Sequence, residues 1–239
     1  MVPIERCLIG HPDLPEVTGQ RWDARSVQAV RSNVGDTAVI ADGRLVAGRT
    51  RLRERVQGRE FRVSTGTFWQ VHPRAAEVLV AAVLRYANVR PGDTVHDLYA
   101  GSGLFAAFLG GAVGREGRVT SVETDVRAVS DARRNLHDLP QVDIRHASVA
   151  AMLREESLSE TPDVVVLDPP RTGARAPVVR GVAGLRPRRV VYVACDPASL
   201  ARDIATFAEM GYGLSHLRAF ALFPMTHHVE CVALLEPVS

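Results

Sequence analysis

The pattern of apolar and polar residues changes near residue 91 of the chain. From there on, short apolar runs alternate with segments in which apolar residues recur at helical spacing. A helix is predicted from Leu104 and another over 198–210. Strands are predicted at 94–96, 118–122, 142–145, 164–167 and 190–193. Such an alternation of strands and helices predicts a doubly wound, mostly parallel sheet.

The last part of the chain breaks this alternation. Two apolar segments, 214–221 and 228–235, follow each other with no helical pattern between them. We therefore expect them to form an antiparallel pair that closes the sheet. The predicted fold class is α/β, a Rossmann-like doubly wound sheet that is mostly parallel and has an antiparallel C-terminal strand.

The first part of the chain has a different pattern. Short strands are predicted at 38–40, 44–46 and 61–63, with Asp42-Gly43 as a hairpin turn. A helix is predicted over 74–86, after the segment that joins the two parts. We divide the chain into an N-terminal extension over residues 1–66, a remnant of a further domain, and an α/β domain over residues 67–239.

Arginines gather in and after the predicted hairpin. Such a run indicates either a solvated face or a patch that faces phosphates. The chain contains no lysine, so every cation other than histidine is an arginine, whose planar guanidinium suits phosphate. The seven arginines are Arg44, Arg49, Arg51, Arg53, Arg55, Arg59 and Arg62.

The composition is that of an ordinary globular protein. The 239 residues are 46% hydrophobic and 23% charged, and the formal net charge of +2 gives no overall basic excess. Three cysteines without metal-ligand spacing predict a reducing compartment, no disulfide framework and no metal site. Because we find neither an apolar run of membrane-spanning length nor a signal peptide, we expect a cytoplasmic protein.

Two predicted strands end in loops that carry reactive side chains. The strand at 190–193 runs into Cys195, and the Asp196-Pro197 that follows stops the strand. The strand at 164–167 runs into Asp168-Pro169-Pro170-Arg171 in the same way. Open α/β sheets bind their ligands at the carboxyl edge of the strands. Cys195 and Asp168 are therefore candidate site residues.

A glycine loop follows the first strand of the α/β domain. Asp97-x-x-x-Gly101-x-Gly103 allows the backbone to approach a ligand at a helix N-terminus. Glu123, at the end of the next strand, is placed to accept both ribose hydroxyls of an adenosine. Ala106 can replace the third glycine of a dinucleotide fingerprint. The loop therefore leaves a nicotinamide dinucleotide and S-adenosylmethionine both open.

With Cys195 and Asp168 added, the chain resembles the S-adenosylmethionine-dependent RNA (uracil-5-)methyltransferases, which make 5-methyluridine in tRNA and rRNA. The resemblance covers about Phe68 to Leu235 and rests on five blocks in the order of the family. These blocks are Phe-Trp-Gln-Val at 68–71, Asp-Leu-Tyr-Ala-Gly-Ser-Gly at 97–103, Asp-Pro-Pro-Arg-Thr-Gly at 168–173, Tyr-Val-Ala-Cys-Asp-Pro at 192–197, and His-His-Val-Glu-Cys-Val at 227–232.

The resemblance implies a role for each matching residue. Cys195 falls on the catalytic nucleophile and Glu230 on the general base. The positions that bind S-adenosylmethionine are Gln70, Tyr99, Glu123 and Asp168, together with the loop glycines Gly101 and Gly103. Asp168 also lies where the family holds the target base, and Arg171 and Arg175 are placed to position phosphates. Cys231, one residue beyond Glu230 in a strand, is expected to point into the core.

The resemblance also implies the reaction and the partners. We expect an enzyme that methylates carbon 5 of a uridine in rRNA or tRNA through a covalent cysteine–pyrimidine adduct, with RNA as its partner and no obligatory protein partner. The chain departs from the family pattern at Leu104, where asparagine is usual. Two alternatives stay open: methylation of cytosine at carbon 5, and a truncated module that binds cofactor or RNA without turnover.

Overall fold

The computed structural model describes residues 7, 9–154, 161–223 and 225–238. Within these ranges the main element is a seven-stranded sheet in the order β11-β12-β10-β9-β6-β7-β8. Its strands are β6 (Thr94–Leu98), β7 (Arg118–Glu123), β8 (Val142–His146), β9 (Val164–Leu167), β10 (Arg189–Ala194), β11 (Tyr212–Phe220) and β12 (Glu230–Pro237).

The strand directions confirm the predicted fold class. The neighbours from β10 through β9, β6 and β7 to β8 are all parallel. Strand β12 runs antiparallel to both β10 and β11. Strands β7 and β8 follow each other on one side of β6, and β9 then pairs with the other side of β6. The strand order therefore reverses between β6 and β9. Ligands of open α/β sheets bind at such a reversal.

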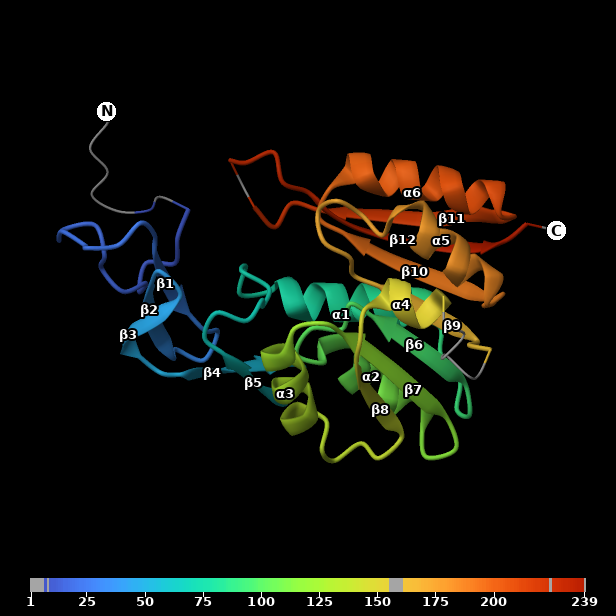
Figure 1. Cartoon of the computed structure of the whole chain (residues 1–239), viewed down its shortest axis with the longest axis horizontal. Helices are drawn as coiled ribbons and strands as arrows, with labels where there is room; N and C mark the ends of the chain where they lie inside the picture. Colours follow the sequence, from blue (N-terminus) through green and yellow to red (C-terminus); the bar gives the residue numbers. More distant parts are fainter. Residues whose placement is uncertain (1–6, 8, 155–160, 224, 239) are drawn as a thin grey trace.

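Helices cover both faces of this sheet (Figure 1). The side chains of Val191 and Val193 belong to the core on one face, and those of Val190 and Tyr192 belong to the core on the other. The first face carries α1 (Ala75–Ala87), α2 (Leu104–Val113) and α3 (Val126–Asn135). The second carries α4 (Val149–Arg154), α5 (Arg175–Gly184) and α6 (Pro197–Glu209).

The N-terminal part forms two small antiparallel sheets. Strands β1 (Val27–Arg31), β2 (Thr37–Ala41) and β3 (Arg44–Gly48) make one, and β4 (Arg51–Val56) and β5 (Arg59–Ser64) make the other. The predicted strands at 38–40, 44–46 and 61–63 are confirmed. The pattern missed β1 and β4, and β4 is obscured because its buried positions alternate between apolar residues and the charged Glu54. The proposed division of the chain at residue 66 stays a prediction.

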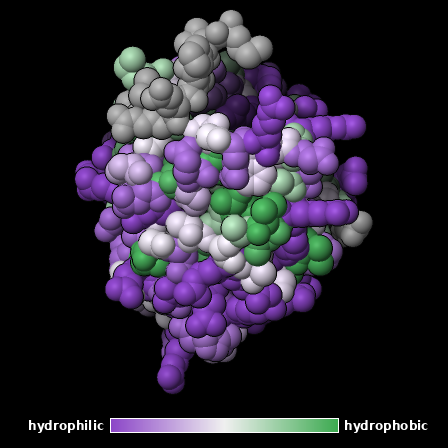
Figure 2. All heavy atoms as spheres, turned by 90° about the vertical axis from the view of Figure 1, so that its left-hand side faces the viewer, coloured by the Kyte–Doolittle hydropathy of each residue, from purple (hydrophilic) through white to green (hydrophobic). Residues whose placement is uncertain are grey.

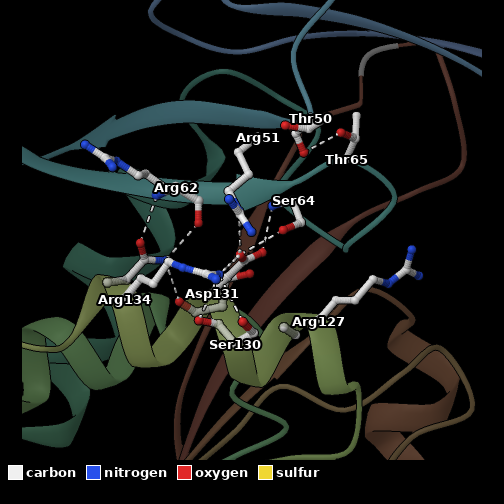
Figure 3. A network of polar contacts seen from close by, with 12 residues as sticks. Thr50, Arg51, Arg62, Ser64, Thr65, Arg127, Ser130, Asp131 and Arg134 are labelled. Carbon is white, nitrogen blue, oxygen red and sulfur yellow. Dashed lines mark hydrogen bonds and ion pairs between the residues drawn. The ribbon is translucent and has the colours of Figure 1, made fainter. Parts of the chain in front are cut away.

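The β4–β5 hairpin is attached to α3 through buried polar groups (Figure 3). The fully buried carboxylate of Asp131 on α3 accepts hydrogen bonds from the Ser64 backbone N at 2.6 Å and from its Oγ at 2.8 Å. Arg51 and Arg134 lie within 3.8 and 3.5 Å of the same carboxylate. These contacts satisfy a charge that would be expensive to bury alone.

Most of the arginine run is used in such internal pairs. Five of its seven members form ion pairs: Arg49 and Arg53 with Asp36, Arg51 with Asp131, Arg59 with Asp138, and Arg62 with Glu60. Three of these arginines, in the pairs with Asp131 and Asp36, meet carboxylates that are themselves buried. The run is therefore chiefly a structural feature that holds the N-terminal strands together and joins them to α3.

The N-terminal end of the molecule is mainly hydrophilic, with a small group of hydrophobic side chains near the centre of the face shown in Figure 2. Strand β3 lies at the edge of its sheet and is exposed along its whole length, including Leu45 and Val46. Across the ranges that the structure describes, we find no helix long and apolar enough to cross a membrane.

Candidate active site

The strand register brings the predicted catalytic residues together. Ala194 of β10 lies opposite Cys231 of β12, so one further residue along these antiparallel strands places Cys195 opposite Glu230. On the other side of β10, the Asp168 backbone N donates a hydrogen bond to the Leu98 carbonyl at 3.2 Å. Asp168 therefore lies where β9 meets β6. All three side chains lie at the edge where the strand order reverses.

The alternation of side chains decides which face each residue points to. Val193 and Val232 point into the core under α1 and α2, so Cys195 and Glu230 continue on the same side. Cys231 is buried in the opposite core under α5 and α6, as predicted. Cys195 and Glu230 therefore face the same side, and Cys231 does not.

Burial and negative charge dominate the electrostatics of this cluster. Burial raises the pKa of Glu230, and Arg171 opposes that rise. Burial, followed by the charges of Glu230 and Asp97, raises the pKa of Asp168 to about 8. Burial also raises the pKa of the half-buried Cys195 thiol, as do Glu230 and Asp168, whereas Arg171 lowers it. The cluster therefore favours the thiol over the thiolate, and a cation brought into the cluster would shift that balance towards the thiolate.

Asp97 is a further candidate site residue, and the sequence marks it only as the start of the glycine loop. It is completely buried, and among the described residues no hydrogen bond of good geometry reaches either of its carboxylate oxygens. Burial raises its pKa to about 7. The backbone N–H of Ala106 lies near enough to lower its pKa, and the charge of Glu123 raises it. An unpaired buried carboxylate is costly, and a cationic ligand offsets that cost. The signal in the sequence was its position, the last but one residue of a strand that leads into glycines.

The glycine loop has the conformation that a close approach requires. Gly101 and Gly103 have φ values of 56° and 88°, and Tyr99 also has a positive φ of 64°. A side chain at Gly101 would meet open space, so its substitution is opposed by conformation rather than by contact. Glu123, at the end of β7, accepts hydrogen bonds from the backbone N of Gly101 at 2.8 Å and of Asp125 at 2.8 Å. Glu123 and the loop therefore form one unit.

Of the other two predicted cofactor residues, Tyr99 belongs to the same loop, whereas Gln70 lies in a different segment of the chain. Tyr99 is near Tyr192 and Asp203, and burial followed by the charge of Asp203 raises its pKa. Gln70 is half-buried in the segment between β5 and α1, next to Trp69, which packs against Phe61 with ring centroids 5.4 Å apart. No hydrogen bond joins Gln70 to another residue of the described ranges, so its role rests on the family resemblance alone.

We expect the substitution Asp97→Asn to stabilise the free protein at pH 8 and to have little effect at pH 4. Folding raises the pKa of Asp97 from 3.8 to about 7. Between these pH values the carboxyl group is protonated in the folded state and ionised in the unfolded state. The folding stability contributed by this group therefore falls as the pH rises through that window. Replacement by the neutral amide should recover up to about 4 kcal/mol at pH 8, because a rise of one in the pKa corresponds to about 1.4 kcal/mol. Urea unfolding at the two pH values measures the difference; an equal gain at both would contradict the assignment.

A buried carboxylate holds the loop that carries Asp168 and Arg171. Asp203 on α6 accepts hydrogen bonds from the Tyr192 hydroxyl at 2.6 Å, from Ala174 N at 2.7 Å and from Arg175 N at 3.2 Å. Its other oxygen accepts from Arg202, whose Nη2 also donates to the Thr172 carbonyl at 2.8 Å. We call Tyr192, Arg202 and Asp203 the loop clamp, because together they fix residues 172–175 against β10 and α6.

Gly173→Ala is expected to displace this loop. Gly173 has a φ of 73°, and an added Cβ would collide with the guanidinium of Arg202 and the carboxylate of Asp203. Strain in the left-handed region and loss of the clamp should lower the unfolding free energy by about 2 kcal/mol or more. Thermal unfolding measures this, with Gly184→Ala in α5 as a control because a Cβ there meets nothing within 4 Å. Equal melting temperatures for the two variants would argue against the clamp.

The seven-stranded sheet, the glycine loop after β6, the acid after β7 and the unpaired Asp97 carboxylate define a class I S-adenosylmethionine-dependent methyltransferase. The orphaned acid suits the cationic sulfonium and ammonium groups of this cofactor better than it suits a dinucleotide. Residues 41–238 match the family model described as tRNA (Uracil-5-)-methyltransferase. The chain belongs to this family, as its motifs predicted, and S-adenosylmethionine is the cofactor that family and fold assign to it.

Curated relatives agree with this assignment. An uncharacterized RNA methyltransferase of Streptomyces avermitilis is 42% identical over 268 residues, which cover 99% of this chain and 62% of the relative. Another from Streptomyces coelicolor is 50% identical over 194 residues, covering 81% of this chain and 42% of the relative. The chain thus spans about half the length of the curated relatives it matches.

A solved structure is similar over most of the chain. The tRNA (uracil-54, C5)-methyltransferase of Pyrococcus abyssi, in complex with S-adenosyl-L-homocysteine, superposes with a TM-score of 0.68 at 28% sequence identity. The similarity covers 82% of this chain and 47% of that enzyme.

Proposed function

We propose that this chain methylates carbon 5 of a uridine in rRNA or tRNA, with Cys195 as the nucleophile and Glu230 as the base. The observation that carries the proposal is the register of β10 and β12, which sets these two side chains opposite each other beside Asp168. We further propose that residues 67–239 form the catalytic domain.

Cys195 makes the reaction possible by changing the electron distribution of the pyrimidine. Carbon 5 of uracil is a weak nucleophile, and S-adenosylmethionine, when bound, supplies an electrophilic methyl group. Attack of the Cys195 thiolate on carbon 6 forms an S–C6 bond and pushes the electron pair through carbon 5 to the carbonyl oxygen as an enolate. Carbon 5 of this adduct is then nucleophilic enough to take the methyl group.

Glu230 completes the reaction by removing one proton. After methylation, carbon 5 carries both its hydrogen and the new methyl group. The Glu230 carboxylate takes that hydrogen as a proton, the C5=C6 double bond re-forms, and the S–C6 bond breaks to release the Cys195 thiolate. A raised pKa suits this role because a more basic carboxylate removes a carbon-bound proton more readily.

The remaining site residues are proposed to hold the two substrates. Tyr99, Gly101, Gly103 and Glu123 hold the cofactor at the carboxyl ends of β6 and β7, together with Gln70. Asp168 touches both cofactor and target base, because it lies between Cys195 and the glycine loop. A paired uridine cannot enter a site between strand ends, so the target base is expected to be flipped out of its helix.

Product analysis tests the proposal. Unmodified rRNA and tRNA would each be incubated with the protein and methyl-labelled S-adenosylmethionine, then digested to nucleosides. We expect label in 5-methyluridine. Label in 5-methylcytosine would identify the alternative cytosine reaction. Cofactor binding without a labelled nucleoside on either RNA would identify a non-catalytic module instead.

A further inference from the structure

A groove that several arginines line lies beside the loop that carries Cys195, on the α5–α6 side of the sheet. It has a volume of about 670 Å³ and lies between the N-terminal ends of α5 and α6. The loop after β9 provides one wall, and Asp196, the residue after Cys195, lies on the other. The Cys195 side chain and the carboxylate cluster point to the α1–α3 side, so this groove lies on the other face of the loop that carries Cys195. Arg171 links the two surfaces, because it lines the groove and its charge acts on both Cys195 and Glu230.

The charge of the groove is positive. Arg171, Arg175 and Arg202 all line it. Arg202 is committed to Asp203 and the Thr172 carbonyl, but Arg171 and Arg175 are exposed and have no ion-pair partner among the described residues. Asp196 is the one acid in the lining, and its carboxylate already accepts a hydrogen bond from Ser199 N at 2.7 Å as the cap of α6. Two guanidinium groups are therefore available to an anion.

Arg175 has a strained backbone conformation. Its φ is 68°, a conformation in which a side chain with a Cβ is disfavoured by roughly 1–2 kcal/mol relative to glycine. The loop clamp imposes it, because Asp203 accepts hydrogen bonds from the backbone N of both Ala174 and Arg175. Strained residues that the surroundings hold in place cluster at functional sites.

We propose that this groove binds a backbone phosphate of the RNA next to the target nucleotide. The inference rests on the proposed function, since a base attacked by Cys195 must carry phosphates on both sides. Arginine binds phosphate through two parallel N–H donors, and such contacts set the position of the RNA without reading its sequence. Arg175 is then a binding residue for RNA, whereas Arg171 serves both the phosphate and the Cys195 thiol.

The test is RNA affinity as a function of salt, measured with bulk unmodified tRNA and rRNA in the presence of S-adenosylhomocysteine. Loss of one phosphate contact in Arg175→Gln should weaken binding roughly five- to tenfold near 0.15 M salt and reduce the slope of log K against log salt by about one. Arg180→Gln is the matched control, because Arg180 is an exposed arginine of the same helix that pairs with Glu209 at 3.6 Å and lies outside the groove. It should leave both quantities close to those of the wild type.

A second variant separates binding from folding. Arg175→Gly removes the same charge but relieves the positive φ, so it should weaken RNA binding like Arg175→Gln without lowering the melting temperature. Wild-type affinity and salt slope in both variants would overturn the proposal. Tight binding of inorganic phosphate that depends on Arg175, with RNA affinity unchanged, would overturn the RNA assignment.

RNA affinity is measured without methyl transfer, so a failure of the groove inference can be distinguished from a failure of the proposed function. If the wild type forms 5-methyluridine and the Arg175 variants bind RNA normally, the groove inference fails and the proposed function stands. If the Arg175 variants lose RNA affinity but the wild type forms no product, the proposed function fails and the groove stands.

Discussion

Cys195→Ala is expected to reduce RNA methylation by roughly 10³-fold or more while leaving S-adenosylmethionine binding intact. Without the thiolate no S–C6 bond forms, and carbon 5 keeps the low nucleophilicity of an ordinary uracil. The change removes one small, half-buried side chain from a loop, so the fold should be retained. Methyl incorporation at saturating RNA, together with calorimetric cofactor binding, measures the two effects separately.

Cys231→Ala is the matched control for this variant. Cys231 lies next to the site in sequence but is buried in the opposite core, where removal of its sulfur leaves a small cavity. We expect a loss of about 1–2 kcal/mol in stability and near wild-type activity at 25 °C. Activity retained in Cys195→Ala, or abolished equally in both variants, would remove Cys195 from its assigned role.

Glu230→Gln should trap the enzyme on its RNA. Cys195 can still attack carbon 6 and carbon 5 can still take the methyl group, but the amide cannot accept the carbon 5 proton. The S–C6 bond then does not break, and a methylated covalent complex accumulates after about one methyl transfer per enzyme. A denaturing gel with labelled cofactor shows this as a slow-moving band that contains both RNA and label.

The same substitution should also change the Cys195 thiol in the free protein. The charge of Glu230 is one of the causes that raise the pKa of Cys195, so its neutralisation lowers that pKa and speeds alkylation by iodoacetamide near pH 8. Glu236→Gln, at the other end of β12 and paired with Arg189 at 3.1 Å, is the control and should alter neither result. Normal turnover in Glu230→Gln would exclude Glu230 as the base.

The sequence was sufficient for the parts of the fold that depend on local patterns. Strands β9 and β10 are buried on both sides and stand out as continuous apolar runs, and the loops after them follow directly. The positions of Cys195 and Asp168 at the sheet edge could therefore be predicted. That Glu230 lies opposite Cys195 could not, because it depends on the register between β10 and a strand that follows much later in the chain.

Three further features could not be predicted from the sequence, because they depend on contacts between residues that are far apart along the chain. Asp131 and Asp203 are acids within helices, which a sequence pattern assigns to solvent, yet both are fully buried and hold a distant segment in place. The arginines of the N-terminal strands suggested a phosphate surface, but most of them pair with acids that are remote in sequence. The unpaired state of Asp97 likewise depends on which neighbours the fold brings near it.

The most direct test of the account is a covalent trapping experiment with RNA that contains 5-fluorouridine. Fluorine at carbon 5 cannot be removed as a proton, so the Cys195–pyrimidine adduct should persist after methyl transfer. In the presence of S-adenosylmethionine we predict a retarded band on a denaturing gel that is absent in Cys195→Ala and present in Cys231→Ala. No band with an RNA that the protein binds, or a band that survives in Cys195→Ala, would contradict the account.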